Sequence, residues 1–420
     1  MAIVAPGRPH ADQHQLGEWG SSAALARLLA DAARLEPDRP VFRDGAGRQD
    51  WCGRPSFELS REIGAEATAR LASYLAGLGL EPAARVGICL PNGSEAAMSI
   101  LATGEAGLTP CLLDVTASAG ELSNAIETAD IRAVITQAKL GADRLAEKLC
   151  FVAAGFFRLR FLLAFGPDVP DGVVDLDPVL LEPRRATTLP PDHPAADEVG
   201  PGLVSFARGA SGRRPYFRSY RSLIAAAAPV VSAAKLKPGD RLLTLLPPDD
   251  LKGLATGLVA GLIAGATVEA HAVFDSAHFL EALARPEPTH VVLPGWMEPA
   301  LAEAAFDPGL RSIILVHEPP LRFEDRPGPS ARIVDVVCCS ELALLSCARG
   351  RPDQISFDAL CAAAAEGLEP PLLEVRLDLY DEIFLRGPAV ALPDRAADSL
   401  DWQPSGLRIE RKGSALTGIA

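Results

Sequence analysis

The sequence has little or none of several features that define whole classes of protein. Aromatic residues make up only 5% of the 420 residues and the net charge is −14, so base-stacking surfaces and a general nucleic-acid partner are not expected. The eight cysteines contain no Cys-x-x-Cys pair and the seven histidines show no ligand spacing, which argues against a disulfide framework or zinc site. No apolar stretch resembles a membrane helix, and residues 1–5 are too short for a signal peptide. We therefore expect a cytoplasmic globular protein with no nucleic-acid partner and no membrane span.

Buried strands and helices alternate in the first half of the chain. Short apolar runs at 85–90, 109–113 and 131–136 are separated by helical patterns at 94–106 and 118–128. Near-continuous apolar strands that alternate with helices are typical of a parallel sheet covered on both faces. Ser94 and Ser118 are the predicted N-caps, and Glu121 stands at the spacing of a capping box.

A second α/β unit follows a stretch at 165–200 that is rich in proline and aspartate and is predicted to be a linker. Beyond residue 369 the segments shorten, which suggests a small antiparallel unit. We predict an α/β fold in which two packed α/β subdomains with mostly parallel sheets are joined by a small β-rich subdomain. The predicted boundaries are a flexible arm at 1–20, the two α/β subdomains at 21–165 and 200–345, and the β subdomain at 370–420.

A glycine-rich turn within residues 205–216 is the most informative motif. Gly209, Ala210, Ser211 and Gly212 form a small turn, predicted between a strand and a helix, whose amides could face an anion. A nucleotide-binding loop usually also has several hydroxyls and a lysine. Here Ser211 is the single hydroxyl within the turn, and the next lysine is Lys235. Two interpretations stay open, an anion-binding turn and a relic turn without a ligand.

Three further groups have both a functional and a structural interpretation. Asp249 and Asp250 are either general-base carboxylates or, as we favour, an ordinary turn and helix cap. Adjacent Cys338 and Cys339 would point to opposite faces of a strand, which favours core packing over a reactive thiol. A basic cluster suggests either a solvated loop or a site for a phosphate or an acidic partner; it consists of Arg208, Arg213, Arg214, Arg218 and Arg221.

Several blocks of sequence resemble the large N-terminal domain of the adenylate-forming (AMP-binding) superfamily, which includes acyl-CoA synthetases, luciferases and peptide-synthetase adenylation domains. The blocks lie at 75–92, 236–247, 262–268, 289–294 and 386–388, in the family's order. The resemblance covers residues 20–420 and implies that family's fold, with ATP and Mg²⁺ as cofactors. It also implies that Ser340 and Glu341 belong to a catalytic motif in which Glu341 holds Mg²⁺. The residues implied in nucleotide binding are Gly209, Ser211, Gly212, Arg213 and Arg214.

The catalytic motifs depart from the family's pattern. Tyr216 stands where the phosphate loop has its lysine, and Val337 stands where an aromatic residue stacks on adenine. Leu407 replaces the aspartate that holds the ribose hydroxyls, and the chain ends at Ala420, before the family's C-terminal domain. We therefore expect ATP to bind poorly.

Three functions are compatible with this mixture of matches and losses. The first is an acyl-CoA synthetase-like protein with weak or no carboxylic-acid adenylation. The second is an active ATP-dependent acid ligase that is completed by a separate C-terminal domain. The third is a non-catalytic scaffold whose arginines dock an acyl-carrier protein.

Overall fold

The computed structural model describes residues 24–181, 201–209, 212–302, 309–323, 331–350, 355–365, 371–393, 401–413 and 415–420. The predicted arm at 1–20 and residues 182–200 of the predicted linker lie outside this part of the chain. The earlier part of that linker contains a two-residue strand, β7 (Val174–Asp175), and a short helix, α8 (Asp177–Leu181).

The first large sheet has its parallel strands in the centre and an antiparallel hairpin at one side. Its order is β19-β9-β8-β4-β3-β5-β6-β7. The strands besides β7 are β3 (Arg85–Cys89), β4 (Thr109–Leu112), β5 (Ile131–Gln137), β6 (Phe161–Phe165), β8 (Gly202–Gly209), β9 (Gly212–Ser219) and β19 (Leu392–Pro393). Strands β8 and β9 form the hairpin, and β19 pairs antiparallel with β9. The central strands are buried on both faces, which explains their near-continuous apolar sequence.

The second large sheet has the order β16-β15-β13-β12-β10-β11-β1-β2, and all of its pairs except the two outermost are parallel. Its strands are β1 (Pro40–Asp44), β2 (Glu58–Ser60), β10 (Arg241–Thr244), β11 (Thr267–Ala270), β12 (Thr289–Pro294), β13 (Leu310–His317), β15 (Arg332–Cys339) and β16 (Ala343–Ala348). The two sheets therefore exchange strands along the sequence, because β1 and β2 come from the segment before 165, whereas β8 and β9 join the first sheet. The proposed boundaries at 165 and 200 separate sequence segments and not sheets.

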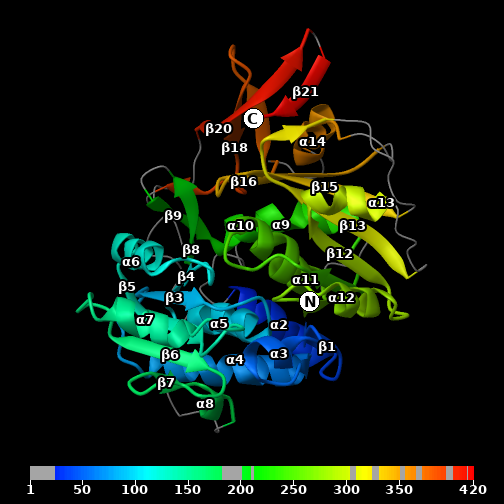
Figure 1. Ribbon diagram of the computed structural model, residues 1–420. Helices are drawn as coiled ribbons and strands as arrows, with labels where there is room; N and C mark the ends of the chain where they lie inside the picture. Colours follow the sequence, from blue (N-terminus) through cyan, green and yellow to red (C-terminus); the bar gives the residue numbers. More distant parts are fainter. Residues whose placement is uncertain are drawn as a thin grey trace.

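Helices form a central layer between the two large sheets and cover both outer faces (Figure 1). The central layer contains α2 (Ala24–Leu35), α4 (Arg61–Ala76), α5 (Ser94–Glu105), α9 (Tyr220–Ala234) and the continuous segment α10 (Leu251–Gly253), η1 (Leu254–Val259) and α11 (Ala260–Ala264). Helices α6 (Ala119–Thr128) and α7 (Leu145–Ala153) cover the first sheet, and α12 (Ser276–Leu283) and α13 (Glu298–Ala302) cover the second. The remaining helices are α3 (Arg48–Cys52), η2 (Gly295–Met297) and α14 (Phe357–Ala365).

A small antiparallel sheet contains the carboxyl-terminal strands of the described chain, drawn in orange and red in Figure 1, together with the earlier edge strand β14 (Leu321–Arg322). Its strands, in spatial order, are β14, β21 (Ala415–Ile419), β20 (Gln403–Lys412), β18 (Glu382–Arg386) and β17 (Glu374–Leu377). The predicted fold class, two mostly parallel α/β sheets with a small β unit, is confirmed.

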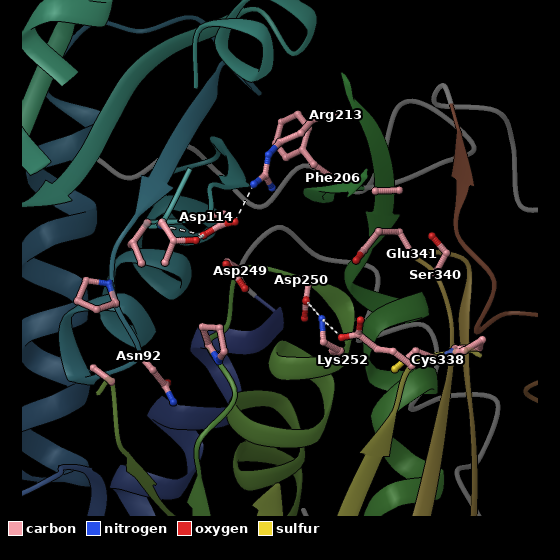
Figure 2. A pocket seen from close by; sticks show the side chains of 18 of the residues that line it. Asn92, Asp114, Phe206, Arg213, Asp249, Asp250, Lys252, Cys338, Ser340 and Glu341 are labelled. Atoms are coloured by element: carbon pink, nitrogen blue, oxygen red, sulfur yellow. Dashed lines mark hydrogen bonds and ion pairs between the residues drawn. The ribbon is translucent and has the colours of Figure 1, made fainter. Parts of the chain in front are cut away.

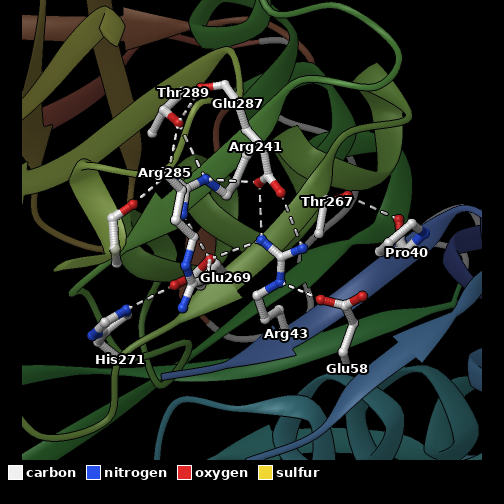
Figure 3. A network of polar contacts seen from close by, with 11 residues as sticks. Pro40, Arg43, Glu58, Arg241, Thr267, Glu269, His271, Arg285, Glu287 and Thr289 are labelled. Atoms are coloured by element: carbon white, nitrogen blue, oxygen red, sulfur yellow. Dashed lines mark hydrogen bonds and ion pairs between the residues drawn. The ribbon is translucent and has the colours of Figure 1, made fainter. Parts of the chain in front are cut away.

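A buried ion network fastens β1 to the rest of the second sheet (Figure 3). Glu269 on β11 accepts hydrogen bonds from Arg43 on β1 at 3.2 Å and from Arg241 on β10 at 3.0 Å. Arg43 also binds Glu58 on β2, at 2.6 Å. The network thus joins four adjacent strands through side chains as well as through the backbone ladder.

Helix starts show which local signals were reliable. Ser118 caps α6, and Glu121 completes the predicted capping box. The prediction for Ser94 was wrong: Gly93 is the cap residue of α5, and the Ser94 hydroxyl instead donates to Asp44 at 2.8 Å. Asp44 lies on β1 of the other sheet, so a tertiary contact has replaced the local cap. Helix α4 begins at Arg61, directly after β2, and the Ser60 side chain caps it by accepting from the Ile63 amide.

All eight cysteines are free thiols, and six of them are buried, as the apolar runs around them predict. Among the described residues, no helix combines the length and the hydropathy that crossing a bilayer requires.

Candidate functional site

A cavity of about 640 Å³ opens where strands of both large sheets end (Figure 2). Asn92 follows β3 and Asp114 follows β4, whereas Asp249 lies beyond β10 and Glu318 immediately after β13. The carboxyl edge of parallel strands is where open α/β sheets bind ligands. The amide of Asn92 donates to the carbonyls of Thr244 and Leu246, at 3.3 and 3.0 Å, and so ties the two sheets together beside the cavity.

The glycine turn lies at the tip of the β8–β9 hairpin. Gly209 pairs with Gly212, and the two residues between them, Ala210 and Ser211, lie outside the described residues. The predicted position between a strand and a helix was therefore wrong, since a second strand precedes α9. Gly212 has φ +115, and a Cβ there would lie 2.9 Å from Oδ1 of Asn124 on α6, so glycine is required at this end of the turn.

Arg213, the next residue, lines the cavity and is held by the first subdomain. Its guanidinium donates to Asp114 at 2.7 Å, and its amide donates to Asn124 at 3.1 Å. Burial alone would raise the pKa of Asp114, but hydrogen bonds from Thr116 and Arg213 lower it to about 2. Both partners are thus charged, and Arg213 has a carboxylate partner before any ligand arrives.

The basic cluster is not one solvated surface. Arg214 is exposed, with its guanidinium 5.8 Å from the Tyr216 ring, and does not line the cavity. Arg218 is 2% exposed, which corrects the expectation of a solvated loop at this position. Desolvation lowers the pKa of Arg218 to about 10, still well above neutral pH. A docking surface for an acidic partner would therefore lack both Arg218 and the paired Arg213.

Ser340 and Glu341 form the turn between β15 and β16 at the cavity wall. Ser340 is exposed and has φ +52, whereas Glu341 is only 7% exposed. Glu341 is therefore a buried carboxylate beside the start of α10. Oε2 of Glu341 accepts from the Ser205 hydroxyl at 2.5 Å and from the Leu251 amide, the first of α10, at 3.1 Å. Burial and the charge of Asp250 raise the pKa of Glu341 to about 7.

Asp249 and Asp250 have different roles. Asp250 is the N-cap of α10 and accepts from the Gly253 amide at 2.9 Å, as predicted. Asp249 faces the cavity and has no partner from another described residue. Burial, reinforced by the charges of Asp250 and Asp114, raises the pKa of Asp249 to about 7. A Cβ on Gly253 would lie 1.8 Å from the carbonyl oxygen of Pro247, so only glycine lets this loop fold so closely over the helix start.

Lys252 is a cavity residue that the sequence did not predict, as are Asp114 and Glu318. Its ammonium group is ion-paired with Asp250 and, at 2.9 Å, with Glu318. Lys252 lies 36 positions after Tyr216, where the family's loop has its lysine, so no motif pointed to it. Like Arg213, it is already neutralised by carboxylates of this chain.

Three of the departures from the family's pattern can be placed in space. Leu407 lines the cavity, as the aligned motif implies. Val337 is fully buried in the core, and the cavity-facing residue of β15 is its neighbour Cys338. Tyr216 also packs in the core, where a lysine would be buried. Within the described residues, no three His, Cys, Asp or Glu side chains are grouped as a metal site.

Comparisons with known proteins show which family and which relatives the chain resembles. The family described as AMP-binding enzyme matches residues 29–195. A salicyl-AMP ligase / salicyl-S-ArCP synthetase of Mycobacterium tuberculosis is 29% identical over 311 residues, which are 72% of this chain and 51% of that protein. A 3-[(3aS,4S,7aS)-7a-methyl-1,5-dioxo-octahydro-1H-inden-4-yl]propanoyl:CoA ligase of the same organism is 29% identical over 341 residues, 76% of this chain and 64% of that protein. The chain therefore spans about half to two thirds of these relatives.

The fold match extends over almost the whole chain. The N-terminal domain of FACL13 from Mycobacterium tuberculosis superposes with a TM-score of 0.65 at 16% identity, covering 94% of this chain and 99% of that one. This likeness concerns the fold alone. Together with the family match over residues 29–195 and the two relatives, it shows that the chain is similar to AMP-binding enzymes and has the fold of acyl-CoA synthetase N-terminal domains.

Proposed function

We propose that the chain is an acyl-CoA synthetase-like protein that retains the family's cavity but has weak or no carboxylic-acid adenylation activity. The observation that supports this most is the charge of the cavity wall. Its described lining contains five carboxylates, Asp114, Asp249, Asp250, Glu318 and Glu341, and two cations, Arg213 and Lys252. With all seven ionised, the wall has a formal charge of −3. Because the pKa values of Asp249 and Glu341 are raised to about 7, both are partly protonated at neutral pH and the charge there is less negative than −3.

Adenylation requires the opposite arrangement. The reaction places negative charge on the α-phosphate, and each cation or oriented donor that stabilises such charge typically contributes about 3–4 kcal/mol. Arg213 and Lys252 are the described cations at the wall, and both already bind carboxylates. Their attraction for a polyanionic ligand is offset by their own partners, and the remaining acids repel it.

The wall also has an apolar side chain at the position of the family's ribose-binding carboxylate. Leu407 cannot accept hydrogen bonds from ribose hydroxyls, and each buried hydroxyl left unpaired costs about 1–3 kcal/mol. Mg²⁺ usually binds through one or two carboxylates together with substrate phosphates. Glu341 is the residue that would hold Mg²⁺ here. A site of this kind needs no group of three protein ligands, and none is found among the described residues.

The unmodified chain should therefore bind ATP with a Kd of about 1 mM or weaker in isothermal titration calorimetry with Mg²⁺. Replacing Leu407→Asp should tighten binding about tenfold, because it restores an acceptor for the ribose. Leu379→Asp is the matched control. Leu379 is 98% exposed, so this substitution adds the same charge at the surface, away from the cavity. Micromolar binding by the unmodified chain would contradict the proposal, and equal effects of the two variants would show that Leu407 is not at the ribose site.

A further inference from the structure

Asp249 is, with Glu341, one of the two carboxylates of the cavity wall that form no ion pair with a described residue. Asp114 is paired with Arg213, and Asp250 and Glu318 share Lys252. Asp249 has no such partner among the described residues, although it lies beside Asp250 and faces the cavity (Figure 2). A carboxylate removed from bulk water is destabilised until a cation or a proton joins it.

Glu341 provides a second, independent acceptor on the same wall. Glu341 is only 7% exposed, and both hydrogen bonds to its side chain are accepted by Oε2. Oε1 has no donor among the described residues, so a polar atom of a buried side chain remains available at the cavity. Arg218 favours the ionised form of Glu341 from the core side but does not line the cavity.

The wall's remaining surface suggests what kind of cation fits. No group of three metal-ligating side chains exists in the described part of the chain, which argues against a bare metal ion held by the protein alone. Apolar side chains lie on the same wall, namely Val115, Leu140, Phe206 and Leu407. A ligand with a positive end and a hydrocarbon body would match both surfaces.

We propose that this cavity binds a small organic amine, with its ammonium group at Asp249 and its apolar body against the hydrophobic wall. The inference rests on the proposed function, because it assigns another ligand to the cavity that we propose binds ATP poorly. The groups that act on Asp249 are Asp250 on its own loop, Asp114 beyond β4 and Lys252 on α10. Two acids therefore repel the Asp249 charge, and one paired cation attracts it.

The test compares three six-carbon probes without ATP: hexylamine, hexan-1-ol and hexanoate. Calorimetry at pH 7 should show that hexylamine binds at least about tenfold more tightly than hexan-1-ol, because its ammonium group forms a partly desolvated ion pair with Asp249. Hexanoate should bind most weakly, because the carboxylates of the wall repel its charge. Asp249→Asn should abolish the preference for hexylamine. Glu127→Gln, on the exposed side of α6, is the matched control and should retain it.

Proton release gives a second readout that a merely apolar cavity would not produce. Because the pKa of Asp249 is raised to about 7, part of this carboxyl is protonated at neutral pH, and an arriving ammonium group expels that proton. Titrations in buffers of different ionisation enthalpy should show proton release at pH 7 that vanishes at pH 9 and in Asp249→Asn. Thermal unfolding of the variant confirms that it is folded.

The contrary outcomes are distinct. Equal binding of hexylamine and hexan-1-ol, tighter binding of hexanoate, or an Asp249-dependent site for Mg²⁺ without any amine preference would each overturn the amine proposal. None of these probes reports on ATP. Failure here therefore leaves the proposal of weak adenylation standing, and micromolar ATP binding would refute that proposal without deciding this one.

Discussion

Replacing Arg218→Met is expected to lower the free energy of unfolding by about 3–5 kcal/mol. The guanidinium lies inside the protein and donates to four acceptors: the Ser222 hydroxyl at 2.9 Å and the carbonyls of Ala389, Glu341 and Leu342 at 2.7, 2.8 and 2.8 Å. Methionine fills much of the same space but donates nothing. Each buried carbonyl left without a donor costs about 1–3 kcal/mol.

The same substitution should loosen the cavity. Arg218 belongs to β9, whereas its carbonyl acceptors belong to the β15–β16 turn and to the segment before β19, so one side chain joins the hairpin to the turn that presents Glu341. Urea unfolding followed by circular dichroism measures the effect. Arg214→Met, on the exposed face of the same strand, should change stability by less than about 0.5–1 kcal/mol. Equal losses in both variants would show that the buried bonds do not stabilise the fold.

Replacing Glu269→Gln should lower the free energy of unfolding by a similar amount, about 3–5 kcal/mol. Glu269 is 1% exposed and faces three arginines (Figure 3): Arg43, Arg241 and Arg285, at 3.2, 3.0 and 3.1 Å. Glutamine removes the charge that these cations share and leaves them facing one another. Glu281→Gln, an exposed residue of α12, is the control and should be nearly neutral.

The free energy of unfolding should also depend on pH differently in the unmodified chain and in Glu269→Gln. Burial alone would raise the pKa of Glu269, but the hydrogen bond from His271 and the charges of Arg241 and Arg285 lower it to about 2, against an ordinary value of 4.5. Because the folded-state pKa is the lower one, the contribution is complete above pH 4.5 and is lost as pH falls from 4.5 toward 2. It amounts to about 3 kcal/mol. Unfolding free energies measured across this window should fall more steeply for the unmodified chain than for Glu269→Gln. Parallel curves would contradict the assignment.

The parts of the structure that the sequence predicted are those fixed by local patterns. Apolar runs at 85–90 and 131–136 became central strands because a strand buried on both faces needs apolar side chains throughout. The capping box at Ser118 formed because its partners lie three residues apart. Asp250 capped its helix for the same reason.

The parts that were missed depend on contacts between distant segments. Ser94 has a capping side chain, but Asp44, 50 positions away, binds its hydroxyl. Arg218 looked like a solvated loop residue because its carbonyl acceptors lie 123 to 171 positions further along the chain. Lys252 reached the cavity without a motif, since its position depends on the close fold of the 247–250 loop over Gly253.

The central claim is that the cavity no longer supports adenylation, and ATP–pyrophosphate exchange tests it most directly. The assay would use purified chain, Mg²⁺, labelled pyrophosphate and a panel of aryl, alkyl and amino-substituted carboxylic acids, with labelled-ATP binding measured alongside. The account predicts acid-dependent exchange that is either undetectable above the enzyme-free background or far slower than about 1 s⁻¹, because several charge-stabilising groups are missing or neutralised. Acid-dependent exchange on the order of 1 s⁻¹ or faster, as in an ordinary enzyme, would contradict it.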